Sequence, residues 1–151
     1  QTVKGDLRSI DVGHVEAILG LVSGAAGQRR AQAPGVDAMR SFEWLRMAPA
    51  GAPARAEYAV AVNQPGRYRF PGGEIDIASV PGGPLELRNW RPGDAYRPAG
   101  DSRERKIKEM FQDARVPRWE RGGWPVLTSG GRVVWAARFG PAVGFAGLRV
   151  R

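Results

Sequence analysis

The sequence contains no cysteine and a single histidine, His14, among its 151 residues. The lack of cysteine excludes disulfide bonds, thiolate nucleophiles, iron–sulfur clusters and the commonest structural zinc sites. One histidine cannot form a histidine metal cage. No stretch approaches the roughly 20 apolar residues of a membrane span, and the N-terminus lacks the basic and then apolar pattern of a signal peptide. We therefore expect a cytoplasmic protein with no metal site and no membrane partner.

Lysine is also scarce, because 20 of the 23 basic residues are arginine, and 15 Asp and Glu leave a formal net charge of +8. Residues 1–83 carry nine basic and eight acidic side chains, whereas residues 84–151 carry fourteen and seven. A net charge of +7 in the C-terminal part indicates a nucleic-acid partner, because the guanidinium group binds phosphate bidentately and stacks on bases. A GC-rich genome would explain the ratio of Arg to Lys, but it would not explain this asymmetry.

The N-terminal third is expected to contain a helix and a strand. Residues 14–22 have the apolar spacing of a helix, and Asp11 is suited to the N-cap position. The core-facing side chains of this helix are expected to be Val15, Ile18, Leu19 and Val22. The elements that follow are a loop over 23–35, a strand over 36–47 and a Pro/Gly/Ala linker over 48–53.

The rest of the sequence predicts strands separated by Pro-Gly and Gly-Gly turns, because 21 Gly and 12 Pro favour turns and argue against a helical bundle. One helix is expected over 102–115, with Asp101 and Glu104 as a capping pair. Its core face is Ile107, Met110, Phe111 and Ala114, which leaves Arg105, Lys108, Gln112 and Arg115 on one flank. That flank is either a contact surface for RNA or a solvated helix face. Ser129-Gly130-Gly131 is interpreted as a hairpin turn, since a strand and not a helix follows it.

These elements define an α+β fold. We expect a β-rich, layered and sandwich-like C-terminal domain with one amphipathic basic helix, preceded by a short helix-and-strand segment. The domains expected are 1–48 as a segment with a helix and a strand, 49–83 as a strand-turn connection, and 84–151 as the C-terminal domain. The first residue is Gln, which indicates a piece of a longer protein.

Residues 85–100 carry the most informative pattern. Arg88 and Arg91 precede the turn Pro92-Gly93-Asp94, and Tyr96 and Arg97 precede a second turn that contains proline. Arginines beside aromatic rings are typical of surfaces that bind phosphates and bases. Asp94 is also placed to pair with a neighbouring arginine and so to lock the turn. The two interpretations are compatible.

The order of motifs resembles a known family. Arg-x-x-Arg-Pro-Gly-Asp is followed by a basic helix that contains Phe111, by Val116-Pro117 and Arg121, and by Trp124-Pro125-Val126-Leu127 with a hairpin that contains Trp135. This order is similar to the C-terminal domain of tRNA(Ile)-lysidine synthetases over about residues 84–140. Residues 10–80 resemble the preceding segment more loosely. The resemblance implies that residues 1–48 are the end of the family's middle, substrate-binding segment and that residues 84–151 are its C-terminal tRNA-binding domain.

The resemblance implies a bacterial enzyme that uses ATP and lysine to convert the wobble cytidine of the isoleucine tRNA with a CAU anticodon into lysidine. ATP and Mg would bind an N-terminal domain that this sequence lacks, so no catalytic residue and no cofactor are expected here. The C-terminal domain would hold the acceptor region of that tRNA. A second copy of the parent protein, in a homodimer, is a further partner to consider. The residues expected to contact RNA are Arg88, Arg91, Arg97, Arg105, Lys106, Lys108, Arg115, Arg118 and Arg121.

The alternative is a basic structural module that mediates interdomain or dimer contacts. A self-contained small enzyme has little support, because the sequence has no cysteine, one histidine and no convergent carboxylates. Glu74 and Asp76, for example, are expected to face solvent on a strand.

Overall fold

The structure of the protein is a computed structural model. The residues described are 11–23, 30–50 and 57–151. The chain divides into two compact units, Gln1–Ala54 and Arg55–Arg151. The linker expected over 48–53 lies partly outside the described residues. Each unit is described by itself below.

The described residues of the first unit form one helix and a three-stranded antiparallel sheet in the order β1-β2-β3. The helix packs against β1 and β2. It is capped as expected, since Oδ1 of Asp11 accepts the backbone N–H of His14 at 3.0 Å. The bounds are α1 (Val12–Ser23), β1 (Arg30–Ala33), β2 (Val36–Ser41) and β3 (Trp44–Pro49).

The core face of α1 differs from the expected one. Leu21 is fully buried and packs with Ala31 and Ala38 of the sheet, and Ala17 and Ile18 lie beside it. The small alanine side chains let the helix approach the sheet along Leu21. As a result Val15, Leu19 and Val22, expected in the core, are 46%, 58% and 60% exposed.

The loop and the strand expected in this unit are both wrong, because each contains a tight turn that was not predicted. The strand expected over 36–47 is two strands, because Phe42 adopts a φ of 54° and Ser41 pairs with Trp44 across a two-residue turn. The loop expected over 23–35 contains β1, because Gly35 adopts a φ of 77° and Ala33 pairs with Val36. The turn at Phe42-Glu43 has no Pro-Gly, Asn-Gly or Gly-Gly signal, whereas Pro34-Gly35 has one that was assigned to the loop.

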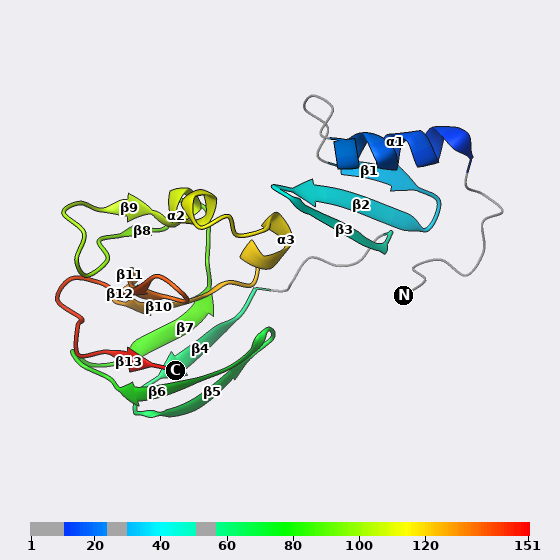
Figure 1. Cartoon of the computed structure of the whole chain (residues 1–151). Coiled ribbons are helices and arrows are strands. Elements are labelled where there is room, and N and C mark those ends of the chain that lie inside the picture. Colours follow the sequence, from blue (N-terminus) through cyan, green and yellow to red (C-terminus); the bar gives the residue numbers. More distant parts are fainter. Residues whose placement is uncertain (1–10, 24–29, 51–56) are drawn as a thin grey trace. The chain divides into compact units, whose positions relative to one another are not determined.

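The second unit is built from three antiparallel sheets with two short helices (Figure 1). Their strand orders are β12-β11-β10-β7-β4, β13-β6-β5 and β8-β9. The strand-rich α+β class expected from the sequence is therefore confirmed. The bounds are β4 (Ala59–Val62), β5 (Gly66–Phe70), β6 (Gly73–Ser79), β7 (Leu85–Asn89), β8 (Ala95–Tyr96), β9 (Arg105–Lys106), α2 (Ile107–Asp113), α3 (Arg118–Arg121), β10 (Pro125–Ser129), β11 (Arg132–Ala136), β12 (Gly140–Pro141) and β13 (Arg149–Val150).

Residues 57–83 belong to this unit and do not form a separate connection. Val60 of β4 pairs with Leu87 of β7, and Ile77 of β6 pairs with Val150 of β13. In Figure 1, β13 lies beside β6. Without residues 57–83, β7 would be an open edge of the five-stranded sheet and β13 would have no partner strand.

The expected hairpin around Gly130-Gly131 is confirmed. Both glycines adopt positive φ values, 57° and 82°, and Ser129 pairs directly with Arg132. Two consecutive residues with positive φ are what a two-residue hairpin turn of the right twist requires, and glycine adopts this conformation without steric cost.

The helix expected over 102–115 is shorter and begins at Ile107. Lys106 occupies the N-cap position without a side-chain cap, so the capping pair Asp101 and Glu104 is not formed. The physical reason is a competing pairing, because Lys106 is extended opposite Ala95 and the N–H of Ile107 donates to the carbonyl of Asp94 at 3.0 Å.

The core face of α2 is as expected. Ile107, Met110 and Phe111 are buried. The Phe111 ring has three aromatic neighbours, with ring centroids 5.1 Å from Trp90, 5.3 Å from Trp124 and 6.0 Å from Phe139. Edge-on aromatic contacts of this kind add stability beyond the buried area.

We expect Phe111→Ala to lower the free energy of unfolding of the second unit by about 3–5 kcal/mol, because it leaves a cavity among three aromatic rings. Urea denaturation followed by tryptophan fluorescence measures this loss. Gln112→Ala, on the exposed side of the same helix, is the control and should change stability by less than about 0.5 kcal/mol. A loss below about 1 kcal/mol for Phe111→Ala would contradict a central role of this ring.

Candidate nucleic-acid interface

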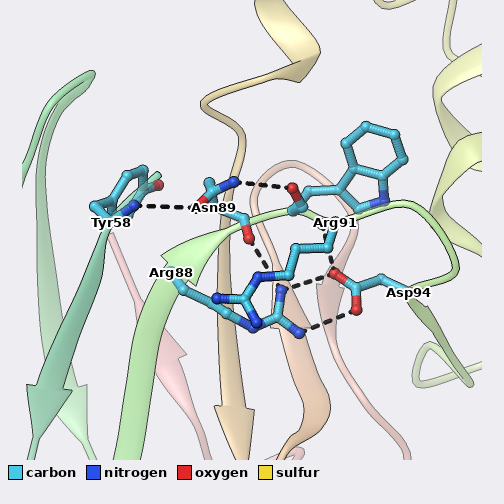
Figure 2. A network of polar contacts seen from close by, with 6 residues as sticks. Tyr58, Arg88, Asn89, Arg91 and Asp94 are labelled. Atoms are coloured by element: carbon cyan, nitrogen blue, oxygen red, sulfur yellow. Dashed lines mark hydrogen bonds and ion pairs between the residues drawn. The ribbon is translucent and has the colours of Figure 1, made fainter. Parts of the chain in front are cut away.

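A buried ion pair lies where β7 ends. The guanidinium of Arg88 donates from NH1 to Oδ2 of Asp94 at 2.8 Å and from NH2 to Oδ1 at 3.0 Å (Figure 2). The side chains are only 7% and 14% exposed. Arg88 also donates to the carbonyl of Asn89 at 2.9 Å. The pairing of Asp94 with a neighbouring arginine, expected from the sequence, is therefore present.

The ion pair fixes the turn at residues 91–94. Oδ2 of Asp94 also accepts the backbone N–H of Arg91 at 2.8 Å, and the N–H of Asp94 donates to the carbonyl of Arg91 at 3.0 Å. Gly93 adopts a φ of 93°, which suits the position after proline in a tight turn. Both hydrogen bonds involve only the backbone of Arg91. Its side chain is exposed, and the turn that carries it is held rigidly.

Asn89 connects this turn to two further segments. Its side-chain oxygen accepts the N–H of Tyr58 at 3.1 Å, and its amide nitrogen donates to the carbonyl of Trp90 at 3.1 Å (Figure 2). The hydroxyl of Tyr58 donates to the carbonyl of Gly123 at 3.1 Å. Neither Asn89 nor Tyr58 was expected at this site. The one signal was the polar Asn89 directly after the apolar pattern of β7.

The ribbon of β8 and β9 continues from the turn and sorts its side chains by face. Tyr96 lies opposite Arg105, and Ala95 lies opposite Lys106. Because side chains alternate along a strand, Tyr96 and Arg105 share one face while Arg97 and Lys106 belong to the other. Tyr96 is buried, whereas Arg97 and Lys106 are exposed. The ribbon therefore presents two cations beside the turn that carries Arg91.

Two of the arginines expected to contact RNA are buried. Arg88, taken as a whole residue, is 5% exposed and is paired with Asp94. Arg121 is 8% exposed, and its Nε and NH2 donate to the carbonyl of Val116 at 2.9 and 2.7 Å. Its Cζ lies 5.5 Å from the centre of the Phe111 ring. Burial, with a smaller effect of Arg118, lowers the pKa of Arg121. Contrary to expectation, Arg88 and Arg121 are therefore not part of the exposed basic surface.

The row of cations expected along one helix flank is not formed. Arg105 lies in β9 and forms ion pairs with Asp113 and with Asp101. Arg115 follows α2 and adopts a φ of 54°. Only Lys108 and Gln112 of that row are on the helix. The exposed residues of the expected set are Arg91, Arg97, Lys106, Lys108, Arg115 and Arg118.

Two hollows lie at the tip of the β10–β11 hairpin, and Gly131 lines both. The smaller, of about 350 Å³, is lined by Arg91, Arg88 and Glu86 among others. The larger, of about 610 Å³, is lined by Arg97, Arg132 and Phe145 among others. Arg132 was not expected at the site. Its place after the Gly-Gly turn was visible in the sequence, but its nearness to residues 93–97 depends on the pairing of β10 with β7.

Within the described ranges, no group of three or more His, Cys, Asp or Glu is placed to hold a metal ion. In the same residues, no helix is long and apolar enough to cross a membrane. The site thus consists of exposed cations around rigid turns.

The comparisons with known proteins agree with this arrangement. Residues 85–148 match the family described as the TilS substrate C-terminal domain. The tRNA(Ile)-lysidine synthase of Solibacter usitatus is 43% identical, in an alignment that covers 97% of this chain and 39% of the relative. That of Geobacter sulfurreducens is 30% identical, with 87% of this chain and 33% of the relative covered. This chain therefore spans about two fifths or less of the length of these relatives.

A solved structure described as the crystal structure of a TilS C-terminal domain is also similar. It superimposes with a TM-score of 0.50 at 25% identity, over 58% of this chain and 83% of that structure. The second unit is thus of the class of TilS C-terminal domains. The chain belongs to the tRNA(Ile)-lysidine synthase family, whose C-terminal domain it carries.

We expect Asp94→Ala to lower the free energy of unfolding by about 3–5 kcal/mol, because it leaves the buried guanidinium of Arg88 without its partner. The double variant Arg88→Met with Asp94→Ala removes both charges and should lose less than the single variant. Asp76→Ala, an exposed carboxylate of the same unit, is the control. Urea denaturation at neutral pH measures all three. A double variant that is less stable than Asp94→Ala would contradict this account.

Tyr96 gives a pH-dependent prediction. Its hydroxyl donates to the carbonyl of Gly140 at 2.9 Å, and burial, followed by the charge of Asp101, raises its pKa. Above pH 10 the unfolded chain loses this proton while the folded chain keeps it, so stability should fall by about 1.4 kcal/mol per pH unit. Tyr96→Phe should be less stable at pH 7 and should lack this part of the decline. Equal slopes for both proteins between pH 9 and 11.5 would refute the assignment.

Proposed function

We propose that this chain supplies the tRNA-holding part of a tRNA(Ile)-lysidine synthase. Its basic surface contacts phosphates in the acceptor region of the isoleucine tRNA with a CAU anticodon. The relatives' name, tRNA(Ile)-lysidine synthase, supports the identity of the RNA. The proposal includes a layered, sandwich-like packing of the domain, which its several antiparallel sheets support.

The observation that carries the proposal is the exposed Arg91 on a turn held by the buried Arg88–Asp94 pair. No hydrogen bond or ion pair of the Arg91 side chain is recorded among the residues that the structure describes. Because the backbone of this turn is already fixed, binding of a phosphate orders the Arg91 side chain but does not have to order the loop. Lys106 and Arg97 extend the cationic surface along the adjoining ribbon, and Lys108 lies in the first turn of α2.

The chemistry of the whole enzyme is also part of the proposal, because this chain spans only 39% of the Solibacter relative. ATP and Mg would act in a part of the synthase outside this chain, where the wobble cytidine is activated and lysine is attached. The role of the chain described here is then to bind and orient the tRNA, which raises the effective concentration of the anticodon at the distant active site.

A second function is favoured by the apolar surface of the first unit. Val12, Val15, Leu19 and Val22 follow one another at helical spacing on α1 and are exposed. On the edge strand β3, Trp44, Leu45 and Met47 are exposed as well. Such surfaces are typical of contacts between domains or subunits. A mass that rises with concentration in sedimentation experiments, without tRNA binding, would support this structural module.

We expect the 151-residue chain to bind unmodified isoleucine tRNA with an affinity that falls steeply between 50 and 200 mM salt, because each neutralised phosphate releases counterions. Arg91→Ala should weaken binding and reduce the slope of log K against log salt by about 1. Filter binding or fluorescence anisotropy measures both quantities. Elongator methionine tRNA, measured in parallel, should bind several-fold more weakly.

Arg46→Ala is the matched control for this experiment. Arg46 is an exposed arginine of β3 in the first unit, so the same charge is removed from a surface outside the proposed one. Its salt slope should equal that of the unchanged chain. The proposal fails if the chain does not bind tRNA at 50 mM salt, or if both variants reduce the slope equally.

A further inference from the structure

The larger hollow at the hairpin tip, which we name the hairpin pocket, has a shape that contact with double-stranded RNA does not explain. Its volume is about 610 Å³, and its lining comes from residues 93–97, from Glu104, from the β10–β11 hairpin and from the segment that contains Ala142, Val143 and Phe145. A volume of this size is within the range of pockets that enclose a small ligand. The bases of a duplex are stacked inside the helix and cannot enter a pocket.

The walls of the pocket are held by paired backbone. The N–H of Val143 donates to the carbonyl of Arg97 at 2.9 Å, and the N–H of Ala142 donates to the carbonyl of Val134 at 2.7 Å. The segment of Ala142 and Val143 is therefore fixed between residue 97 and β11. A pocket that exists before the ligand arrives loses little entropy on binding.

The lining combines an apolar side with two cations. Phe145 is half-buried and Val143 is 46% exposed, and both line the pocket. Two successive turns hold Phe145, since its N–H donates to the carbonyl of Ala142 and its carbonyl accepts from Leu148, both at 2.9 Å. These bonds fix the backbone from which the ring extends, and an aromatic ring in a pocket lining is suited to stack on a base.

The charged side chains fit the polar parts of a nucleotide. Arg97 is anchored through Nε to the carbonyl of Asp101 at 2.9 Å, and Arg132 is exposed at the hairpin tip. Both can donate to a phosphate. The carboxylate of Asp94 is neutralised by Arg88, whereas Glu104 offers an exposed acceptor. A carboxylate accepts hydrogen bonds from the exocyclic amino groups of cytosine and adenine.

We infer that the hairpin pocket binds one unpaired nucleotide of the RNA, with the base against Phe145 and the phosphate near Arg97 and Arg132. Glu104 favours a base that carries an amino group. The inference rests on the proposed function, since that places the acceptor region of a tRNA on this domain. The single-stranded 3′ end, which ends in C, C and A in every mature tRNA, is the source of such a nucleotide.

The test compares intact isoleucine tRNA with the same tRNA lacking its four 3′-terminal nucleotides, each bound to the 151-residue chain. The intact tRNA should bind about tenfold more tightly. Phe145→Leu keeps the apolar volume but removes the ring, and Arg132→Ala removes one cation. Each variant should weaken binding of the intact tRNA severalfold and leave binding of the shortened tRNA unchanged.

Arg149→Ala, an exposed arginine outside the pocket lining, is the control and should not alter the ratio of the two affinities. Because Arg132 is exposed, its replacement keeps the test valid if Phe145→Leu fails to fold. The inference is overturned if both tRNAs bind equally tightly, or if the pocket variants weaken both to the same extent. In either case the proposed function would survive, whereas absence of binding by both tRNAs would remove the proposed function itself.

Discussion

The buried ion pair between Arg88 and Asp94 is the interaction on which the basic surface depends. It joins the end of a central strand of the five-stranded sheet to the turn that leads into β8. The same carboxylate holds the backbone of Arg91, and the carbonyl of Asp94 accepts the first N–H of α2. The turn, the ribbon and the start of the helix are therefore positioned by one residue. Because burial removes the hydration of both charges, such a pair adds little net stability, whereas loss of one partner is strongly destabilising.

Arginines of the second unit have two different roles. Arg88 and Arg121 are internal, and each guanidinium binds acceptors of the protein. Arg91 and Arg132 are exposed at the tips of turns. The division explains why a count of positive charges overstates the surface that RNA could meet. It also explains why arginine serves both purposes, since the planar fork suits carbonyl and carboxylate acceptors inside the protein and phosphate outside it.

The features predicted correctly from the sequence are those set by local patterns. The spacing of Ile107, Met110 and Phe111 identified the buried face of α2, and Gly130-Gly131 identified the hairpin. The wrong predictions involve strand pairs and tight turns that the hydrophobic pattern does not show. Asp101 is a residue type that is common at N-caps. The helix nevertheless begins only at Ile107, because the residues before it form β9 and pair with β8. Likewise, no local pattern distinguishes the buried Arg88 from the exposed Arg91, because burial depends on which strands flank β7.

The pairing of β13 with β6 has a consequence for synthesis of the protein in the cell. Arg149 donates its N–H to the hydroxyl of Ser79, 70 positions earlier in the chain. During translation, the β5–β6 hairpin therefore emerges from the ribosome long before its third strand. Until residue 150 is available, one edge of β6 exposes unpaired backbone groups, which can recruit the edges of other nascent chains. Shielding of that edge by chaperones would then be needed most during the seconds between synthesis of β6 and of β13.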